Sequence, residues 1–362
     1  MQFGDLVQEM CLIPALAGHE TPMIKYLHSA FTPHADQVTV DKAGNVIAKI
    51  AGTDPAAPSV MVFAHMDQLG LVVRKISEDG FIRVERLGGV PEKVLPGLRV
   101  QVLSEDGDPV PGVIGLKAHH ATGAEEKYKV IPYQDLYIDV GAASSCEVRN
   151  LGIEVGCPVV YEPSFQVLTG GRISGTSLDD RGGCAILVKL AEQARVQRPA
   201  ATLYLVGTVQ EEFNLRGAQV AANVIKPDLA ISLDLVVAGD TPDLKDRSDL
   251  RLGGGPAMSM YSFHGRGTLN GTIPHPRLVQ LAKEAASRAG VPLQRSAMVG
   301  ILTDSAYVQL VGDGIPVIDL GFPARYTHTP IEVCQLSDLE GLFRLVWEMV
   351  WALAPGMDLS RL

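Results

Sequence analysis

Apolar residues near both ends of the chain recur at the three- and four-residue spacing of amphipathic helices. The first such pattern covers Phe3, Leu6, Val7, Met10 and Cys11. A second helix is predicted to begin at Thr21, an N-cap residue, with Pro22 at the first helical position. A capping box formed by Ser337 and Glu340 predicts the start of the last helix.

Short apolar runs of the kind found in buried strands alternate with further helical patterns. The strand-like runs cover residues 60–64, 202–206, 229–233 and 316–320. The helical patterns cover residues 181–194, 216–225 and 276–289. This alternation predicts an α/β domain with a mixed sheet and helices on both faces.

The middle of the chain has a different pattern, with short strands and turns but no long helix. Residues 71–76 and 81–85 predict one hairpin, and residues 98–103 and 110–114 predict another. We therefore expect a small, barrel-like β insertion at 71–165 that interrupts one discontinuous domain, 1–70 and 166–362. Apolar segments at the edge of such an insertion would suit dimerisation.

Composition and charge narrow the function classes. The 362 residues carry a net charge of −10, which argues against nucleic-acid or anionic-membrane partners. No apolar run reaches the length of a membrane span, and no cationic segment marks the start as a signal peptide. Five cysteines without a CxxC pair fit reduced thiols, so we expect a cytoplasmic protein.

Acidic and histidine side chains follow the predicted strands. Since ligand sites of open α/β sheets lie beyond the carboxyl ends of the strands, these side chains should converge. Imidazole and carboxylate ligands together suit zinc, cobalt or manganese. The candidates are His65, Asp67, Asp179, Asp180, Glu211, Glu212, Asp234 and His328.

Each candidate also has a purely structural interpretation. The Asp179-Asp180 pair could cap a helix, and Glu211-Glu212 could lie in a solvated loop. Asp234 could pair with an arginine, and a single histidine at a strand end is more often structural than a ligand. The joint occurrence of all these residues at equivalent positions favours a metal site.

Five motifs in this order resemble the TET (tetrahedral) aminopeptidases, metallopeptidase family 42, which include glutamyl and deblocking aminopeptidases. The resemblance covers nearly the whole chain, including the β insertion. The motifs are His65-Met-Asp67, Leu178-Asp-Asp-Arg181, Gln210-Glu-Glu212 with Leu215-Arg-Gly-Ala218, Asp234 with Ala238-Gly-Asp-Thr-Pro242, and Thr327-His-Thr-Pro330.

The resemblance implies a co-catalytic site with two divalent metal ions, in an enzyme that removes N-terminal residues from short peptides. Asp179 would bridge the ions, with His65 and Asp234 on one ion and Glu212 and His328 on the other. Asp179 is preferred to Asp180 because the first acid of an Asp-x-x-x-Gly element is the ligand in related metallopeptidases. Relatives assemble from dimers into dodecamers that enclose the active sites.

Two further residues are expected to support catalysis. Asp67 lies two residues after His65, so on an extended chain its carboxylate can accept the second imidazole N–H. Glu211 precedes the expected ligand Glu212 and would act as general base on a metal-bound water nucleophile.

Some positions depart from the family or stay open. Gln68 stands where an acid is common, and Phe213-Asn214 replaces an apolar-Gly pair, so both bear on substrate preference. Thr303-Asp304 belongs to a segment that the family has near its substrate site, and it could equally cap a helix. His119 and His120, if they are adjacent on a strand, would point to opposite faces and would suit a lid or interface.

Other functions remain open from the sequence. A metal-dependent deacylase or carboxypeptidase could use the same ligands. A glycoside hydrolase also uses paired carboxylates, but these flank the bond about 5–9.5 Å apart without a metal. A non-catalytic assembly protein is a further alternative, although no ligand position is lost. The sequence contains no GxSxG, HExxH, GxGxxG or P-loop element.

Overall fold

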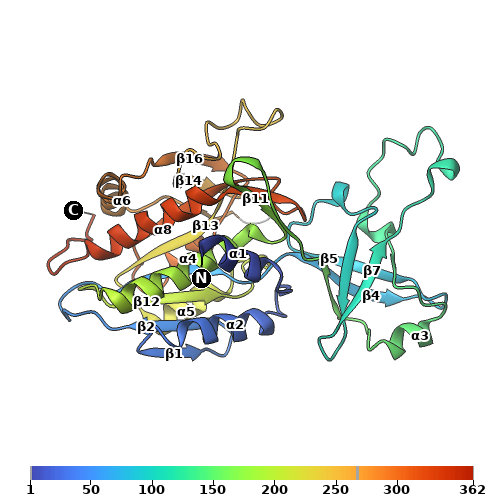
Figure 1. Ribbon diagram of the computed structural model, residues 1–362, viewed down its shortest axis with the longest axis horizontal. Helices are drawn as coiled ribbons and strands as arrows, with labels where there is room; N and C mark the ends of the chain where they lie inside the picture. Colours follow the sequence, from blue (N-terminus) through green and yellow to red (C-terminus); the bar gives the residue numbers. More distant parts are fainter. Residues whose placement is uncertain (1, 266–268, 362) are drawn as a thin grey trace.

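The computed structural model describes residues 2–265 and 269–361. A large α/β body and a small β-barrel lie side by side (Figure 1). The helices are α1 (Phe3–Cys11), α2 (Thr21–Phe31), α3 (Ser145–Asn150), α4 (Leu178–Val196), α5 (Gly217–Ile225), α6 (Pro276–Ala289), α7 (Ser305–Val308) and α8 (Leu336–Trp351). None of these described helices is both long and apolar enough to cross a membrane.

The strands of the α/β body form one mixed sheet, with 12 strands among the described residues. They are β1 (Gln37–Val40), β2 (Val46–Ile50), β3 (Val60–His65), β10 (Phe165–Val167), β11 (Arg172–Gly175), β12 (Leu203–Thr208), β13 (Leu229–Val237), β14 (Ala257–Phe263), β15 (Gly271–Thr272), β16 (Gln294–Val299), β17 (Val317–Arg325) and β18 (Glu332–Gln335). The main order is β1-β2-β12-β3-β13-β17-β18-β11-β10.

Four neighbouring strands at the centre of this sheet run parallel. β12 pairs with β3, β3 with β13, and β13 with β17, all in the parallel sense. Their carboxyl ends therefore meet at one edge. The arrangement confirms the predicted α/β class with a mixed sheet.

Helices cover both faces of the sheet, as the sequence predicts. α1, α2, α4, α6 and α8 contribute to the larger hydrophobic core with the sheet. α5 and α7 contribute to a second core on the other face, with Met61, Phe63 and Val206. The strands between these cores are buried on both faces, which explains their continuous apolar runs.

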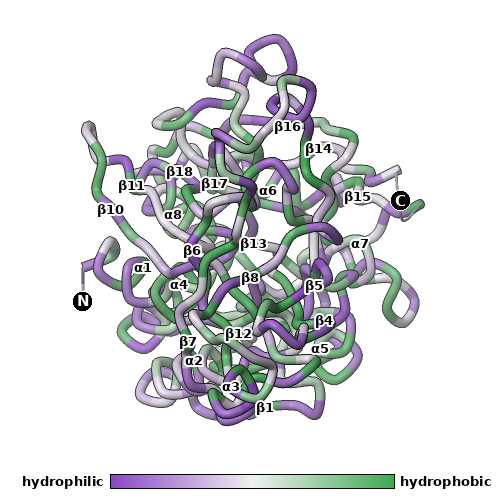
Figure 2. Tube along the Cα trace, turned by 90° about the vertical axis from the view of Figure 1, so that its right-hand side faces the viewer, coloured by the Kyte–Doolittle hydropathy of each residue, from purple (hydrophilic) through white to green (hydrophobic). Residues whose placement is uncertain are grey.

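The barrel has its own hydrophobic core. It closes in the order β4-β5-β8-β7-β6-β9. Its strands are β4 (Gly70–Ile76), β5 (Ile82–Leu87), β6 (Arg99–Leu103), β7 (Pro109–Ile114), β8 (Ile138–Asp139) and β9 (Pro158–Tyr161). Both predicted hairpins are confirmed, since β4 pairs with β5 and β6 with β7. In Figure 2 the barrel faces the viewer, in front of the α/β body.

Two predicted helix starts are wrong in detail. Thr21 is the first residue of α2, and Glu20 occupies the N-cap. Ser337 lies inside α8, whose N-cap is Gln335, and no side chain caps this end. The capping box does not form because β18 leads directly into the helix, so the chain enters it from an extended strand.

Short helical turns connect other segments: Glu92–Val94, His119–Ala121, Tyr133–Asp135 and Thr169–Gly171. His119 and His120 therefore lie in an exposed 3₁₀ turn, not on a strand. Their rings lie 5.6 Å apart and nearly perpendicular. The strand-based expectation of opposite faces was wrong because the chain leaves the barrel ladder after β7 and forms a helical turn at His119–Ala121.

Candidate metal centre

The carboxyl edge of the four parallel strands carries most of the candidate residues. His65 is the last residue of β3, and Glu211 and Glu212 follow the end of β12. Asp234 lies within β13, which continues to Val237, so the strand does not end there as the sequence predicts. His328 follows the end of β17.

Two groups of side chains have the spacing of metal ligands, and they share one residue. One group consists of His65, Asp179 and Asp234, and the other of Asp179, Glu212 and His328. Within each group, the nitrogen and oxygen ligand atoms all lie within 4.8 Å of one another. The structure thus brings together five residues that are distant in sequence.

The sequence left Asp179 and Asp180 hard to distinguish, and the structure gives them different surroundings. Asp179 lies in both groups, whereas Asp180 lies in neither. The Oδ1 atom of Asp180 accepts a hydrogen bond from the backbone N–H of Gly183 at 2.9 Å. The capping interpretation therefore applies to the second acid of the pair.

The histidines face the carboxylates directly. Nε2 of His65 lies 2.9 Å from Oδ1 of Asp179. Nε2 of His328 lies 3.6 Å from Oδ2 of Asp179 and 3.8 Å from Oε1 of Glu212. Burial lowers the pKa of His328, but the nearby carboxylates of Glu212 and Asp179 outweigh it and raise the pKa to about 9. Nδ1 of His328 lies 3.0 Å from the Gly89 carbonyl oxygen, which fixes the ring orientation.

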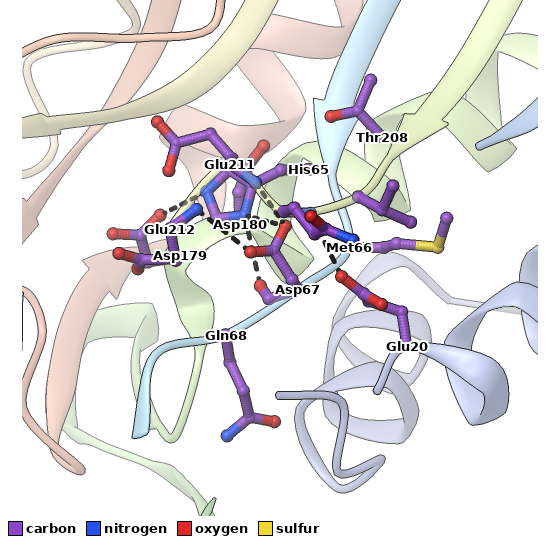
Figure 3. A network of polar contacts seen from close by, with 12 residues as sticks. Glu20, His65, Met66, Asp67, Gln68, Asp179, Asp180, Thr208, Glu211 and Glu212 are labelled. Carbon is purple, nitrogen blue, oxygen red and sulfur yellow. Dashed lines mark hydrogen bonds and ion pairs between the residues drawn. The ribbon is translucent and has the colours of Figure 1, made fainter. Parts of the chain in front are cut away.

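Asp67 has a different contact from the one expected. Nδ1 of His65 lies 3.2 Å from the backbone carbonyl of Asp67 and 3.7 Å from its carboxylate. The carboxylate instead accepts the backbone N–H groups of Glu211 and Glu212, each at 3.0 Å (Figure 3). Asp67 therefore orients the loop that carries both glutamates, while its main chain orients the imidazole.

The acidic groups repel one another in a buried setting. Burial raises the pKa of Glu212 to about 7; the charge of His328 opposes this rise, and the carboxylate of Asp179 adds to it. Burial likewise raises the pKa values of Glu211 and Asp234 well above their usual range. A carboxylate cluster with two imidazoles fits divalent ions, because bound cations would neutralise this repulsion.

A cleft of about 600 Å³ gives access to these residues. Its lining includes Glu211, and its size matches that of small-molecule sites. Asn214 also lines it, while Phe213 is exposed. Gln68 points elsewhere: its Oε1 accepts the N–H of Ala15 at 2.9 Å.

Three supporting residues were missed from the sequence. Glu332 accepts the backbone N–H groups of His328 at 2.7 Å and of Asp179 at 3.0 Å. Glu20 accepts the N–H of Gln210 at 3.1 Å, at the start of the loop with the two glutamates. Arg181 is fully buried and donates to the carbonyls of Met10, Ile13 and Met66.

Glu332 had a signal in the sequence, as an acid in an apolar run four residues after His328, and Arg181 ends the motif that contains Asp179 and Asp180. Asp304, left open from the sequence, precedes α7 but makes no capping hydrogen bond. Its Oδ2 instead accepts the hydroxyl of Thr208 at 3.0 Å, at the end of β12. Thr303 lines the cleft.

Several known proteins are similar to this chain in sequence and in fold. The family described as M42 glutamyl aminopeptidase matches residues 44–345. The putative aminopeptidase SgcX of Escherichia coli is 39% identical over 332 residues, 92% of this chain and 89% of the relative.

Two solved structures have the same fold. The aminopeptidase APDkam598 of Desulfurococcus kamchatkensis has a TM-score of 0.92 at 34% identity, covering 98% of this chain and 96% of its own. The TET1 peptidase of Pyrococcus horikoshii, which can assemble into a tetrahedron or a large octahedral shell, has a TM-score of 0.86 at 28% identity, covering 97% of this chain and all of its own. The chain therefore belongs to the M42 family of metallo-aminopeptidases, enzymes that hydrolyse N-terminal residues from peptides.

Proposed function

We propose that this chain acts with two divalent metal ions, zinc or cobalt, with manganese as a further option. His65 and Asp234 would hold one ion, Glu212 and His328 the other, and Asp179 would bridge them. The observation that supports this most directly is the membership of Asp179 in both ligand groups. Two dications about 3.5–4 Å apart need an anionic ligand between them.

The ions, when bound, would polarise the scissile carbonyl and lower the pKa of a water molecule toward about 7. Glu211 would take the proton of that water and later deliver it to the leaving amine. Asp67 supports this role by holding the backbone N–H groups of Glu211 and Glu212. Glu332 would keep Asp179 and His328 in place through their backbone N–H groups.

The comparisons with known proteins bear differently on the alternative functions that the sequence left open. Membership of an aminopeptidase family argues against a glycoside hydrolase and a non-catalytic assembly protein. A deacylase or carboxypeptidase with the same ligands differs in its substrate. A comparison of peptides that have a free N-terminal amine with N-acylated peptides would distinguish these activities.

We also propose a cytoplasmic homo-oligomer. The five cysteines are free thiols, and four are buried, which fits a reducing compartment.

The insertion at 71–165 would mediate dimerisation, and dimers would assemble into a dodecamer. The related TET1 peptidase, which assembles into a tetrahedron, supports this arrangement. An enclosed site would admit short peptides.

Metal removal tests the proposed chemistry. Exhaustive chelation should abolish hydrolysis of aminoacyl reporter substrates, and zinc, cobalt or manganese should restore it. Chelation should also lower the unfolding temperature, because the clustered carboxylates then repel one another without compensation. Full activity after exhaustive chelation would contradict the metal-dependent mechanism.

A further inference from the structure

A small pocket extends from the cleft along the sheet. Asp234, Leu235, Ile301 and Thr303 line both the pocket and the cleft, so the two spaces adjoin. The pocket has a volume of about 20 Å³, room for about one water molecule. A longer guest would require the segment at 301–303 to move outward.

A buried carboxylate lines this pocket without a cationic partner. Asp319 lies in the middle of β17 and is 5% exposed. Its carboxylate faces the hydroxyls of Ser305, Thr303 and Thr272, which hydrogen-bond to it, and none of these partners is a cation. Burial raises the pKa of Asp319 to about 6, although the hydroxyls of Ser305, Thr303 and Thr272 lie near enough to oppose this.

Another polar group in the pocket is unpaired. The hydroxyl oxygen of Ser262 is buried and lacks a hydrogen-bond partner among the described residues. The described pocket lining contains no Lys, Arg or His. Nearby Arg247 lines a neighbouring space and donates to the carbonyl of Val299 at 3.0 Å. The described lining of the pocket therefore carries negative charge and contains no positively charged hydrogen-bond donor.

The strand register places Asp319 at a suitable distance from the metal centre. Asp234 pairs with Gly321, and Ser232 pairs with Asp319. Because side chains alternate along a strand, Asp234 and Asp319 lie on the same face of the sheet. The usual rise per residue and the usual spacing between strands put their Cα atoms about 8 Å from each other. A four-carbon stem can span this separation.

The remaining walls suit an aliphatic stem with a charged end. Leu235, Val236, Met298, Ile301 and Leu320 line the pocket. Lysine and arginine side chains lie along apolar surface and keep their charged group against a polar partner. A buried carboxylate without a cationic partner is costly even when hydroxyls donate to it, so a guest cation would relieve that cost.

We propose that this pocket receives the side chain of the substrate's N-terminal residue and that Asp319 selects lysine or arginine there. The proposal rests on the proposed aminopeptidase function and specifies its substrate class. An ammonium or guanidinium group would contact the Asp319 carboxylate and the hydroxyls of Ser262 and Thr303. An acidic residue would be repelled, and a neutral one would leave the carboxylate without a cationic partner.

The test compares lysine with norleucine, which has a similar aliphatic stem but no amine. With the metal-loaded protein, kcat/KM should be on the order of 10²-fold higher for a lysyl than for a norleucyl reporter substrate. Lysinamide should also bind more tightly than norleucinamide in calorimetry. Equal values or a preference for norleucine or glutamate would overturn the proposal while leaving the aminopeptidase function intact.

The variant Asp319→Asn should lose this discrimination, with Asp106→Asn, at an exposed turn of the barrel, as the matched control. The wild-type comparison does not depend on how Asp319→Asn folds. Unchanged discrimination in folded Asp319→Asn would overturn the assigned role. Selective binding of lysinamide without hydrolysis of any substrate would support the pocket and contradict the proposed hydrolysis.

Discussion

At the scale of single residues, buried groups around the metal centre hold the main chain as well as side chains. Asp67, Glu20 and Glu332 all accept backbone N–H groups of site segments. Arg181 is also buried, and its guanidinium donates to main-chain carbonyls. Burial lowers the pKa of Arg181, but a guanidinium stays charged in proteins. These charged side chains therefore hold the main chain of the segments that carry the candidate ligands.

Glu211→Gln tests the general base. We expect a fall in kcat of about 10²–10⁴-fold, because the amide cannot take the proton of the nucleophile. Metal content should stay at the wild-type level, since Glu211 is absent from both ligand groups. Elemental analysis and steady-state kinetics measure the two effects. Near-wild-type turnover in this variant would exclude the role of Glu211.

Glu332→Gln tests the contact between β18 and the two proposed ligands. An amide can accept through only one of its terminal atoms, so one of the two N–H groups loses its acceptor. Metal affinity should fall about 10–100-fold, as expected when a group that orients ligands is lost. Competition with a metal-binding dye measures this. Glu340→Gln, at an exposed position of α8, is the control, and equal affinity in both variants would contradict the positioning role.

At the scale of elements, an ion pair connects the end of β17 to the segment after β13. Arg325 donates to Asp240 at 2.8 Å through Nε and at 2.6 Å through Nη2. The N–H of Leu252 donates to the same carboxylate at 3.1 Å. Burial raises the pKa of Asp240, but these hydrogen bonds outweigh it and hold the pKa below its usual value. The pair therefore holds two site-bearing strands together near the cleft.

Asp240→Asn should lower the free energy of unfolding by about 1–3 kcal/mol at neutral pH. Because folding depresses the pKa of Asp240, its contribution is complete above the unfolded pKa of about 3.9 and is lost as pH falls through the folded pKa. The difference between wild type and variant should thus be constant from pH 5 to 7 and shrink below about pH 4. Denaturant unfolding across this range measures it, with Asp106→Asn as control. A difference that grows in acid would refute the assignment.

At the scale of the whole molecule, the barrel stands apart from the α/β body (Figure 1). Apolar side chains are exposed on it, including Leu116, Tyr128 and Val130 in the segment between β7 and β8. His328 contacts Gly89, which follows β5, so the barrel segment also borders the metal centre. Assembly through the barrel would therefore affect how substrates reach the candidate metal centre.

Light scattering should give an assembly mass that is a multiple of the 38.7-kDa chain, up to twelve copies. Leu116→Glu with Tyr128→Glu should reduce that mass, because charges would replace apolar contact surface. Val167→Glu, on exposed β10 of the α/β body, serves as control. A monomeric wild type at working concentration would contradict the proposed assembly.

The sequence by itself determined the α/β class, the family and the order of the site motifs. This was possible because apolar periodicity reports burial and because strand-end residues of parallel strands share one edge. The hairpins of β4 with β5 and of β6 with β7 followed from local turns. The starts of α2 and α8 were misjudged, since capping depends on the conformation of the preceding chain.

The sequence preferred Asp179 to Asp180 only through the family resemblance, and only the tertiary structure revealed their different partners and the contacts of Glu332 and Asp319. Asp179 and Asp180 are chemically identical neighbours, and the direction of each side chain depends on partners more than 100 residues away or on the local helix turn. Asp319 lies in an apolar strand pattern, and its pocket forms only where β13, β14, β16 and β17 meet. Long-range packing decides such contacts, because local sequence does not specify which side chains face each other across a sheet.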